Sequence, residues 1–266
     1  MHQQRTFSIL KRVVFTTVRK KEWRFIMNSE LLSLRLQTVV NYIPQGFRLA
    51  DIGSDHAYLP CHVVSKGTVP FAIAGEVVEG PFTSAVKQVQ VECLEAKISV
   101  RLGNGLEVIN PGEVDCITIC GMGGTLISNI LDRGKSKLPE IKRLILQPNI
   151  GSSSLRRWLL ENDWMLINED IVAEDGKVYE ILVAEHGDPY AGYERDDLEA
   201  GLLLGPYIKK QKNAAFIHKW EGEKANWQRI LKQLQLAEDS LQNQLKKQEL
   251  LRKIQIVEEV LELEED

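Results

Sequence analysis

The feature that most constrains the fold is a regular alternation of short apolar runs with helix-like segments between residues 48 and 162. The apolar runs are five to eight residues long, which is typical of buried strands. The predicted strands are 48–52, 70–77, 97–102, 115–120 and 143–147, and the predicted helices are 57–66, 81–94, 124–132 and 152–162. Because helices separate the strands, we expect a parallel sheet with helices on both faces.

The pattern changes at residues 164–185, where two apolar runs follow one another without a helix between them. They are joined by AEDGK, in which Asp175-Gly176 is a strong β-hairpin signal. An α/β sheet that closes with an antiparallel hairpin is typical of the Rossmann-like sheet of class I methyltransferases. A classical dinucleotide-binding sheet stays parallel, so the hairpin favours the methyltransferase sheet.

The composition changes after about residue 189, and Lys, Gln, Glu and Leu dominate from Glu221 onward. Apolar residues recur there every three or four positions, which indicates an amphipathic or coiled-coil helix pair. Each helix needs a partner for its apolar stripe, so we expect a hairpin folded near Glu238, Asp239 and Ser240. The predicted domains are an α/β domain over 27–188 and a helical coiled-coil domain over 189–266.

Residues 1–26 differ from the rest of the chain in charge. They hold seven Lys/Arg and one Glu, whereas the remainder has 26 basic and 36 acidic residues, a net charge of −10. They lack the apolar region and cleavage site of a signal peptide. We interpret them as a basic leader that is not native or is disordered, with Met27 as the physiological start and Asn28 or Ser29 capping a helix. The rival hypothesis is a basic arm that binds nucleic acid.

Composition argues for a soluble globular protein, with 44% hydrophobic and 26% charged residues. No run approaches the length of about 18 apolar residues that a membrane-spanning helix needs. The cysteines Cys61, Cys93, Cys116 and Cys120 lack CxxC spacing. We therefore expect a cytoplasmic protein with reduced thiols, no membrane contact and no metal site.

The first predicted strand runs into LADIGSDHAYLP (49–60), which places Asp51, Gly53, Asp55 and His56 where doubly wound sheets bind ligands. One glycine with two carboxylates is a poor setting for a phosphate. It suits a cationic ligand that also carries sugar hydroxyls, and S-adenosyl-L-methionine is such a ligand. The alternative is that Asp51 and Asp55 are turn and helix-cap residues. We expect His56 to hydrogen-bond locally rather than to act as a base.

Two further strand ends carry polar residues that suit the same ligand. Glu76 ends the second strand, where an acidic residue accepts hydrogen bonds from both ribose hydroxyls. The alternative is a solvated glutamate at a strand end. After the third strand, Asn104 is placed to read an adenine edge, and Gly105 lets the ring lie against the backbone. These two residues also fit an ordinary turn.

The fourth strand runs into ICGMGG (119–124) and the fifth into LQPN (146–149). Three glycines indicate either close approach of a ligand or a turn with positive φ, and we expect the 121–124 loop to shape the pocket for the acceptor. The side-chain amides after the fifth strand each donate and accept, so they suit the edge of a base. The predicted catalytic residues are Gly121, Met122, Gly123, Gln147, Pro148 and Asn149.

Taken in order, LADIGSDHAYLP, GNGLEVI, ICGMGG, LILQPN and EDGKVYEIL resemble the bacterial tRNA (adenine-N1)-methyltransferase family that modifies adenine 22, called TrmK. The resemblance covers about residues 28–265, and its most specific motifs are DIGSDHAYLP and CGMGG. It implies a Rossmann-like S-adenosyl-L-methionine domain followed by a helical coiled-coil domain. The leader is the one departure from the family pattern.

The resemblance implies methylation of N1 of adenine 22 in tRNA, with Gln147 and Asn149 positioning the base. Two alternatives remain at this point: a methyltransferase that acts on a small molecule or protein, and a non-catalytic module whose coiled coil recruits a partner. The acidic composition argues against a nucleic-acid partner, whereas locally grouped basic residues argue for one. The candidate tRNA-binding residues, which fit ordinary solvated faces equally well, are Arg133, Lys135, Arg156, Arg157, Lys209 and Lys210.

Overall fold

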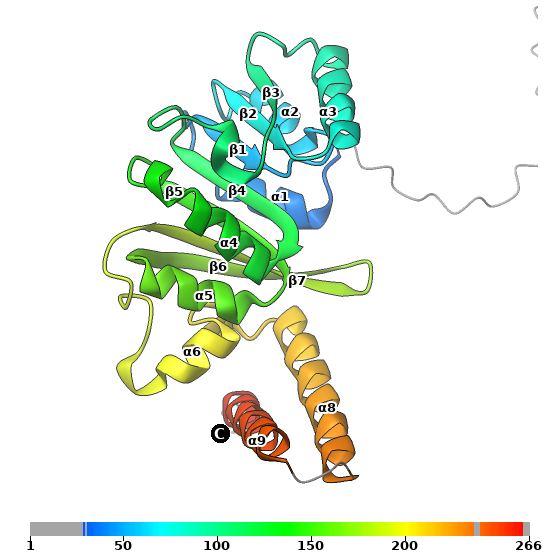
Figure 1. The fold of residues 1–266 in the computed structure, drawn as a ribbon, viewed down its shortest axis with the longest axis vertical. Coiled ribbons are helices and arrows are strands. Elements are labelled where there is room, and N and C mark those ends of the chain that lie inside the picture. Colours follow the sequence, from blue (N-terminus) through cyan, green and yellow to red (C-terminus); the bar gives the residue numbers. More distant parts are fainter. Residues whose placement is uncertain (1–28, 30, 237–239, 263–266) are drawn as a thin grey trace, which may run out of the picture.

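The computed structural model describes residues 29, 31–236 and 240–262 (Figure 1). Its centre is a seven-stranded sheet in the order β3-β2-β1-β4-β5-β7-β6. The strands are β1 (Leu49–Ile52), β2 (Ala72–Glu76), β3 (Ile98–Leu102), β4 (Cys116–Gly123), β5 (Arg143–Ile150), β6 (Trp164–Glu174) and β7 (Lys177–His186). The predicted leader, residues 1–26, lies outside the described residues.

The sheet confirms the predicted mixture of parallel strands and a final hairpin. Strands β1 to β5 pair in parallel, and β7 pairs antiparallel with both β5 and β6. The strand order reverses between β1 and β4, because β1 is followed outward by β2 on one side and by β4 on the other. Ligands of open α/β sheets bind at such a reversal, outside the carboxyl ends of the strands.

Two strands extend further than the sequence pattern predicted. β4 reaches Gly123 and β5 reaches Ile150, because their ends pair with each other through Met122 opposite Pro148 and Gly123 opposite Ile150. The register shifts between Cys120 and Met122, as at a β-bulge. The loop predicted at 121–124 is therefore wrong: these residues form a bulged strand end that leads directly into the next helix.

Helices cover both faces of the sheet, as predicted. The helices are α1 (Leu34–Asn41), α2 (Tyr58–Ser65), α3 (Glu79–Val91), α4 (Gly124–Arg133), α5 (Ser152–Glu161), α6 (Leu198–Leu204), α7 (Ile208–Gln211), α8 (Ala214–Leu236) and α9 (Leu241–Glu262). Side chains of α1, α2 and α3 fill the core on one face, and those of α4 and α5 fill it on the other.

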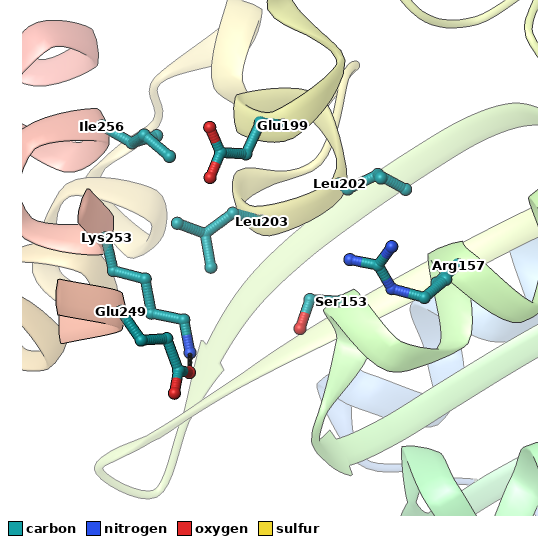
Figure 2. A pocket seen from close by; sticks show the side chains of 8 residues that line it. All are labelled: Ser153, Arg157, Glu199, Leu202, Leu203, Glu249, Lys253 and Ile256. Carbon is teal, nitrogen blue, oxygen red and sulfur yellow. Dashed lines mark hydrogen bonds and ion pairs between the residues drawn. The ribbon is translucent and has the colours of Figure 1, made fainter. Parts of the chain in front are cut away.

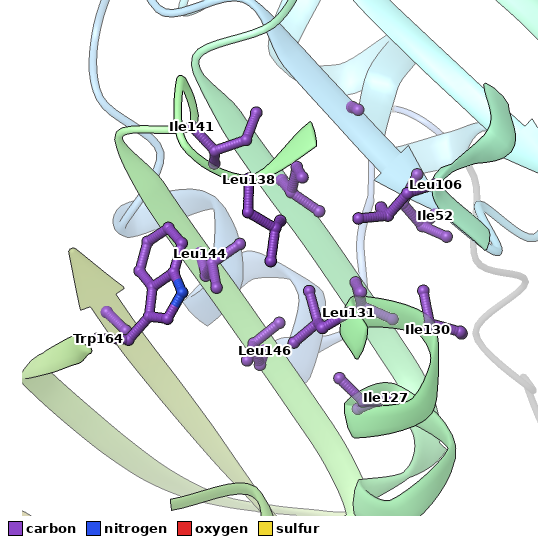
Figure 3. Close-up of a cluster of buried hydrophobic side chains, with 14 of the residues drawn as sticks. Ile52, Leu106, Ile127, Ile130, Leu131, Leu138, Ile141, Leu144, Leu146 and Trp164 are labelled. Carbon is purple, nitrogen blue, oxygen red and sulfur yellow. The ribbon is translucent and has the colours of Figure 1, made fainter. Parts of the chain in front are cut away.

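Figure 3 shows the α4 side of this core, where Ile127 and Leu131 face Leu144 and Leu146 of β5. All four side chains are fully buried. Burying one such side chain contributes about 1.5–3 kcal/mol before the entropy of ordering it is subtracted. This packing holds β4 and β5 in place directly beneath the strand ends that carry the candidate site.

Helix α1 begins later than predicted. Its N-cap is Ser33, whose hydroxyl accepts a hydrogen bond from the Leu36 N–H at 3.3 Å. Ser29 does not cap the helix, because its hydroxyl donates to Glu92 and its carbonyl accepts from the ring Nδ1 of His62 at 2.7 Å. Asn28 lies outside the described residues. The Glu174 carboxylate of β6 accepts hydrogen bonds from the first N–H groups of α1 and so anchors the helix to the sheet.

The C-terminal helices form the predicted pair, in which α8 and α9 pack against each other below the sheet (Figure 1). Ser240 directly precedes α9, whereas Glu238 and Asp239 lie outside the described residues. Phe216 and Trp220 of α8 join Val257 of α9 in a small core that also contains Ile171 of β6. The helical pair is therefore packed onto the edge strand of the sheet.

A buried group of charges connects the sheet to α8. The Arg156 guanidinium of α5 pairs with Glu169 of β6 at 2.6 Å and with Glu180 of β7, and Lys219 of α8 also pairs with Glu180. Burial alone would raise the pKa of Glu180, but the charges of Lys219 and Arg156 outweigh it and hold that pKa below its usual value. The prediction that Arg156 contacts tRNA is wrong, because its side chain is fully buried.

In the parts of the chain that the structure covers, no helix combines the length and apolar character needed to cross a membrane. The same residues contain no cluster of three or more His, Cys, Asp or Glu side chains placed to hold a metal ion.

Candidate cofactor and acceptor site

The carboxyl ends of β1, β2 and β4 surround a cavity of about 280 Å³. It lies where the strand order reverses, as the sequence predicted. Of the predicted site residues, the cavity wall includes Asp51, Gly53, Asp55, Glu76, Gly121 and Met122. The wall also includes Arg35 of α1, which the sequence analysis did not identify.

Asp51 is a buried carboxylate in the wall of this cavity. It is 4% exposed, and its carboxylate accepts hydrogen bonds from Thr118 Oγ1 at 2.6 Å and Ser54 Oγ at 2.7 Å. Burial raises the pKa of Asp51, and the two hydroxyl donors only partly offset that effect. Asp51 is thus held in one orientation and is not the simple turn residue that the alternative interpretation proposed.

The loop after β1 has an uncommon backbone. Asp55, His56 and Ala57 adopt positive φ angles of 42°, 68° and 56° in succession, a region that residues other than glycine rarely occupy. The Asp55 N–H donates to Glu76 Oε1 at 2.6 Å, which ties the loop to the end of β2. The backbone there is held against a neighbouring strand, where strain of this kind is often part of a binding site.

This backbone places the side chains of Asp55 and His56 differently from those of Asp51 and Glu76. The Asp55 side chain is 76% exposed at the cavity rim, and the His56 ring lies 3.5 Å from its carboxylate. His56 also stacks on Tyr58 with ring centroids 5.4 Å apart, and it is not part of the cavity wall. The local hydrogen bond predicted for His56 is not found among the described residues, where its ring only approaches Asp55 and stacks on Tyr58. Direct cofactor contact stays a prediction.

Glu76 presents one free carboxylate oxygen. The residue is 6% exposed, and Oε1 accepts the Asp55 N–H, whereas Oε2 has no partner in the described part of the chain. Burial raises the pKa of Glu76, and the nearby carboxylates of Asp51 and Asp55 add to that shift. An oxygen left free at the end of β2 is what a pair of ribose hydroxyls requires.

Asn104 and Gly105 lie at the same sheet edge but outside the cavity wall. Asn104 caps the short 3-10 helix η1 (Gly105–Val108), and the Glu107 carboxylate accepts the Asn104 N–H at 3.1 Å. The Gly103 N–H donates to the Glu76 carbonyl at 2.8 Å, so this turn sits next to the end of β2. Contact between an adenine ring and these two residues therefore stays a prediction.

On the acceptor side, four residues form a closed set of hydrogen bonds. Gln147 Oε1 accepts from the Gly121 N–H at 3.0 Å and from the Arg35 guanidinium. Because that oxygen receives two donors, the Gln147 amide has one orientation, and Nε2 donates to Asn149 Oδ1 at 3.3 Å. Asn149 Nδ2 then donates to the Gly121 carbonyl at 2.7 Å.

This arrangement separates the roles predicted for the two amides. Gln147 is completely buried, so the predicted direct contact between Gln147 and the base is wrong. Asn149 is exposed at the strand end, and its amide retains one N–H and one oxygen lone pair for a ligand. Pro148 lies between them and pairs in the sheet with Met122, whose Sδ–Cε end lies against Gly53. Gln147 therefore orients Asn149, and Asn149 faces outward.

Arg35 is the residue of the candidate site that the sequence reasoning missed. Its guanidinium lies 5.4 Å from the centre of the Tyr179 ring and donates to Gln147. A signal existed, because Arg35 is the only charged residue in the apolar stretch 31–43. That signal does not identify a partner 112 positions away in the sequence.

The candidate tRNA-binding residues divide by exposure. Arg133 and Arg157 are exposed, Lys135 contacts Asn162 at 2.5 Å, and Lys210 pairs with Glu194 at 2.7 Å. Lys209 is 8% exposed and paired with Asp197, so its predicted surface role is wrong, as for Arg156. Arg157 lines a cavity of about 300 Å³ between α5, α6 and α9, where Glu199, Glu249 and Lys253 give a mixed charge. Figure 2 shows these side chains around the cavity.

The cofactor cavity fits S-adenosyl-L-methionine by its chemistry. Three carboxylates, from Asp51, Asp55 and Glu76, face one guanidinium, from Arg35. The net negative wall suits a ligand with a sulfonium and an ammonium group, and the single guanidinium offers a donor for its carboxylate. The free Glu76 oxygen and the backbone at Gly53 lie in the same cavity wall, so contact with the sugar of the ligand stays a prediction.

Comparison with known proteins gives a consistent result. Residues 49–259 match the family model TrmK, described as tRNA (adenine(22)-N(1))-methyltransferase. The chain is 52% identical over 236 residues to the tRNA (adenine(22)-N(1))-methyltransferase of Bacillus subtilis (strain 168), covering 89% of this chain and 99% of that protein.

Solved structures agree with the sequence comparison. The crystal structure of the B. subtilis m1A22 tRNA methyltransferase TrmK superposes with a TM-score of 0.83 at 51% identity, covering 86% of this chain and 98% of that one. A Streptococcus pneumoniae protein solved in complex with S-adenosyl-L-methionine superposes with a TM-score of 0.77 at 41% identity, covering 87% and 100% of the two chains.

Proposed function

The chain belongs to the TrmK family of tRNA (adenine(22)-N(1))-methyltransferases, and from that premise we infer that it methylates N1 of adenine 22 in tRNA with S-adenosyl-L-methionine. The observation on this chain that best supports the proposal is the position of Asn149. It stands at the edge of the carboxylate-lined cavity and is tied to Gly121 of the cavity wall at 2.7 Å. An acceptor held by Asn149 would therefore lie beside the methyl donor.

On the cofactor side, the cavity residues bind and orient. S-adenosyl-L-methionine, when bound, supplies an electrophilic methyl group on its sulfonium. We assign the free oxygen of Glu76 to the ribose hydroxyls, and the carboxylates of Asp51 and Asp55 to the positive charge of the ligand. Asn104 and Gly105 are assigned to the adenine ring, on the strength of their place at the end of β3.

On the acceptor side, Asn149 positions the base. Adenine N1 carries a lone pair at neutral pH, so it needs alignment more than a general base. The spare lone pair of Asn149 Oδ1 is suited to accept from the exocyclic amine, which leaves N1 free to face the cofactor. Because N1 lies on the Watson–Crick edge, the adenosine must be unpaired or turned out of its stack before it reaches Asn149.

Methylation leaves the adenine ring positively charged, and the site contains groups that favour this charge. The bulged end of β4 directs the Gly121 carbonyl toward Asn149, and the Asp51 carboxylate lies in the same cavity wall. Preorganised dipoles and charges of this kind stabilise a developing charge without reorganising. Gly121, Met122 and Gly123 are therefore assigned to shaping the reaction site.

Transfer of labelled methyl from S-adenosyl-L-methionine to an unmodified tRNA transcript tests the proposal. The full chain is used, and a matched transcript with guanine in place of adenine 22 is the control. We expect label in the first transcript alone. Label in both transcripts would show that adenine 22 is not the methylated position. Label in neither transcript, with S-adenosyl-L-methionine binding intact, would point to a small-molecule or protein acceptor.

A further inference from the structure

A second cavity is lined by Asn149 and lies between the end of β5 and helix α8. Its volume is about 340 Å³. The residues that line it come from the β5–α5 junction, from β7 and from α8, and they are Asn149, Ile150, Gly151, Val178, His218, Lys219, Gly222, Glu223 and Asn226. Asn149 therefore lines this second cavity and, through its hydrogen bond to the Gly121 carbonyl, adjoins the wall of the cavity with the candidate cofactor residues.

The two sides of this second cavity differ in character. The β5 and β7 side contributes the apolar side chains of Ile150, which is 75% exposed, and Val178 next to Asn149. The α8 side is polar, with an imidazole from His218, a carboxylate from Glu223 and an amide from Asn226. A nucleobase has the matching shape: an apolar face for Ile150 and a polar edge for α8.

The charges in the cavity favour a base over a phosphate. The Lys219 ammonium is already paired with the buried Glu180 carboxylate and lies 5.1 Å from the centre of the Trp220 ring. Glu223 adds a negative charge that would repel a phosphate. The His218 ring and the Asn226 side-chain amide remain as hydrogen-bonding groups; Asn226 Oδ1 already accepts from the Arg229 guanidinium at 2.8 Å, and the amide keeps both N–H donors and one lone pair for the edge of a base.

Gly222 is an independent sign that the cavity is kept open. It lies in the interior of α8, where glycine is less favourable than alanine. A Cβ atom at this position would meet nothing within 4 Å, so packing does not require a glycine. A larger side chain at residue 222 would instead occupy the cavity that Gly222 lines.

We propose that this second cavity binds an unpaired nucleobase of the tRNA next to the target adenosine, with α8 supplying its polar contacts. The inference rests on the proposed function. Turning the target adenosine out of its stack also removes a stacking partner from the adjacent nucleotide. That nucleotide is covalently linked to the one at Asn149, so the cavity that shares Asn149 lies within its reach.

Filling the cavity tests the proposal. In Gly222→Leu the new side chain occupies the cavity, and leucine is a better helix former than glycine, so the variant is expected to fold. Gln228→Leu, on an exposed face of the same helix that does not line the cavity, is the matched control. We expect Gly222→Leu to raise the KM for tRNA about tenfold, the scale of one lost base-stacking contact, with unchanged S-adenosyl-L-methionine affinity. The control should behave as the wild type.

A second measurement identifies the ligand as a base. Two transcripts are compared with the intact one: the first lacks the base immediately before adenine 22, and the second lacks the base immediately after it. Both should bind the wild type more weakly than the intact transcript does. One of the two should bind Gly222→Leu as tightly as the intact transcript binds that variant. Equal losses for both proteins with both transcripts would overturn the proposal, as would an unchanged KM in Gly222→Leu. Equilibrium binding of tRNA is measured in parallel, so the cavity is tested even if the wild type transfers no methyl group. An absence of methyl transfer would therefore overturn the proposed function without deciding whether the cavity binds a base.

Discussion

Arg35 in α1, which lines the cofactor cavity, and the buried Gln147 in β5 meet side chain to side chain, and their contact determines how Asn149 is oriented. The guanidinium donates to the Gln147 oxygen, which also accepts the Gly121 N–H at 3.0 Å. Two donors on one oxygen leave the Gln147 nitrogen to donate to Asn149. One arginine thus fixes the orientation of two side-chain amides that are far from it in sequence.

We expect Arg35→Ala to lower kcat for tRNA methylation about 10- to 100-fold, because a hydrogen bond to a charged group is worth about 1.5–3 kcal/mol. The base would then be held by Asn149 on a Gln147 side chain that has lost one of its two donors and is less firmly oriented. Arg35→Lys retains the charge but not the planar guanidinium, and should recover activity only in part. Single-turnover rates at saturating tRNA and cofactor report the effect. A variant that lost only cofactor affinity would show that Arg35 binds the cofactor and does not act through Gln147.

Asn149→Ala is expected to reduce kcat/KM for tRNA by about two orders of magnitude, since it removes both the grip on the base and the contact with the Gly121 carbonyl. Binding of S-adenosyl-L-methionine, followed by calorimetry, should change little. Asn149→Asp is the informative companion, because it keeps the acceptor for the exocyclic amine and loses the donor to Gly121. Near-wild-type turnover of Asn149→Ala at saturating tRNA would remove this residue from the proposed acceptor site.

Cofactor affinity should weaken on acidification at pH values above 4.5, the ordinary pKa of glutamate, because burial raises the pKa of both Asp51 and Glu76. The ionised forms bind the ligand, and each proton taken up removes a negative charge and an acceptor. The free energy of unfolding depends on pH in the opposite direction. A carboxyl whose pKa is raised in the folded state stabilises the fold when it is protonated, and this contribution is lost as the pH rises through the folded-state pKa. Calorimetric titrations across this range, with Glu76→Gln as comparison, should show a flatter pH profile for the variant.

The buried charges around Arg156 should matter for stability and not for RNA affinity. Arg156→Met leaves Glu169 and Glu180 with less compensation in the interior, and we expect it to lower the free energy of unfolding by about 3–5 kcal/mol. The adjacent Arg157→Met is the matched control, because that side chain is exposed and should change stability by less than about 0.5 kcal/mol. Urea unfolding of both variants and of the wild type measures these free energies of unfolding. If Arg156→Met were as stable as Arg157→Met, the buried methionine would stabilise the interior as well as the charged network does.

Much of the fold follows from local patterns. Each of the first five strands lies where an apolar run was found, and the hairpin at Asp175-Gly176 closes the sheet as predicted. Helix starts and strand ends were less predictable. β4 and β5 extend through glycine and proline because each strand end is paired with the other, and pairing between strands is not a property of either segment alone.

The candidate site divides in the same way. Asp51 and Glu76 were found from sequence because parallel strands bring their carboxyl ends to one sheet edge, whatever else the chain does. Arg35, the burial of Gln147 and the cavity beside α8 were not found, because each depends on contacts between segments far apart in the chain. The grouping of Arg156 with Arg157 predicted two surface residues, yet α5 turns one into the interior and the other outward.

By itself, therefore, the sequence determined the order of strands and helices, the carboxylates at the strand ends and the kind of ligand they suit, because these depend on residue periodicity and on residue chemistry. Only the tertiary structure decided which amide faces the substrate, which arginines are buried, and where α8 leaves space beside Asn149. Those outcomes depend on packing, since a side chain's direction and exposure are set by the elements placed against it and not by its neighbours in the chain.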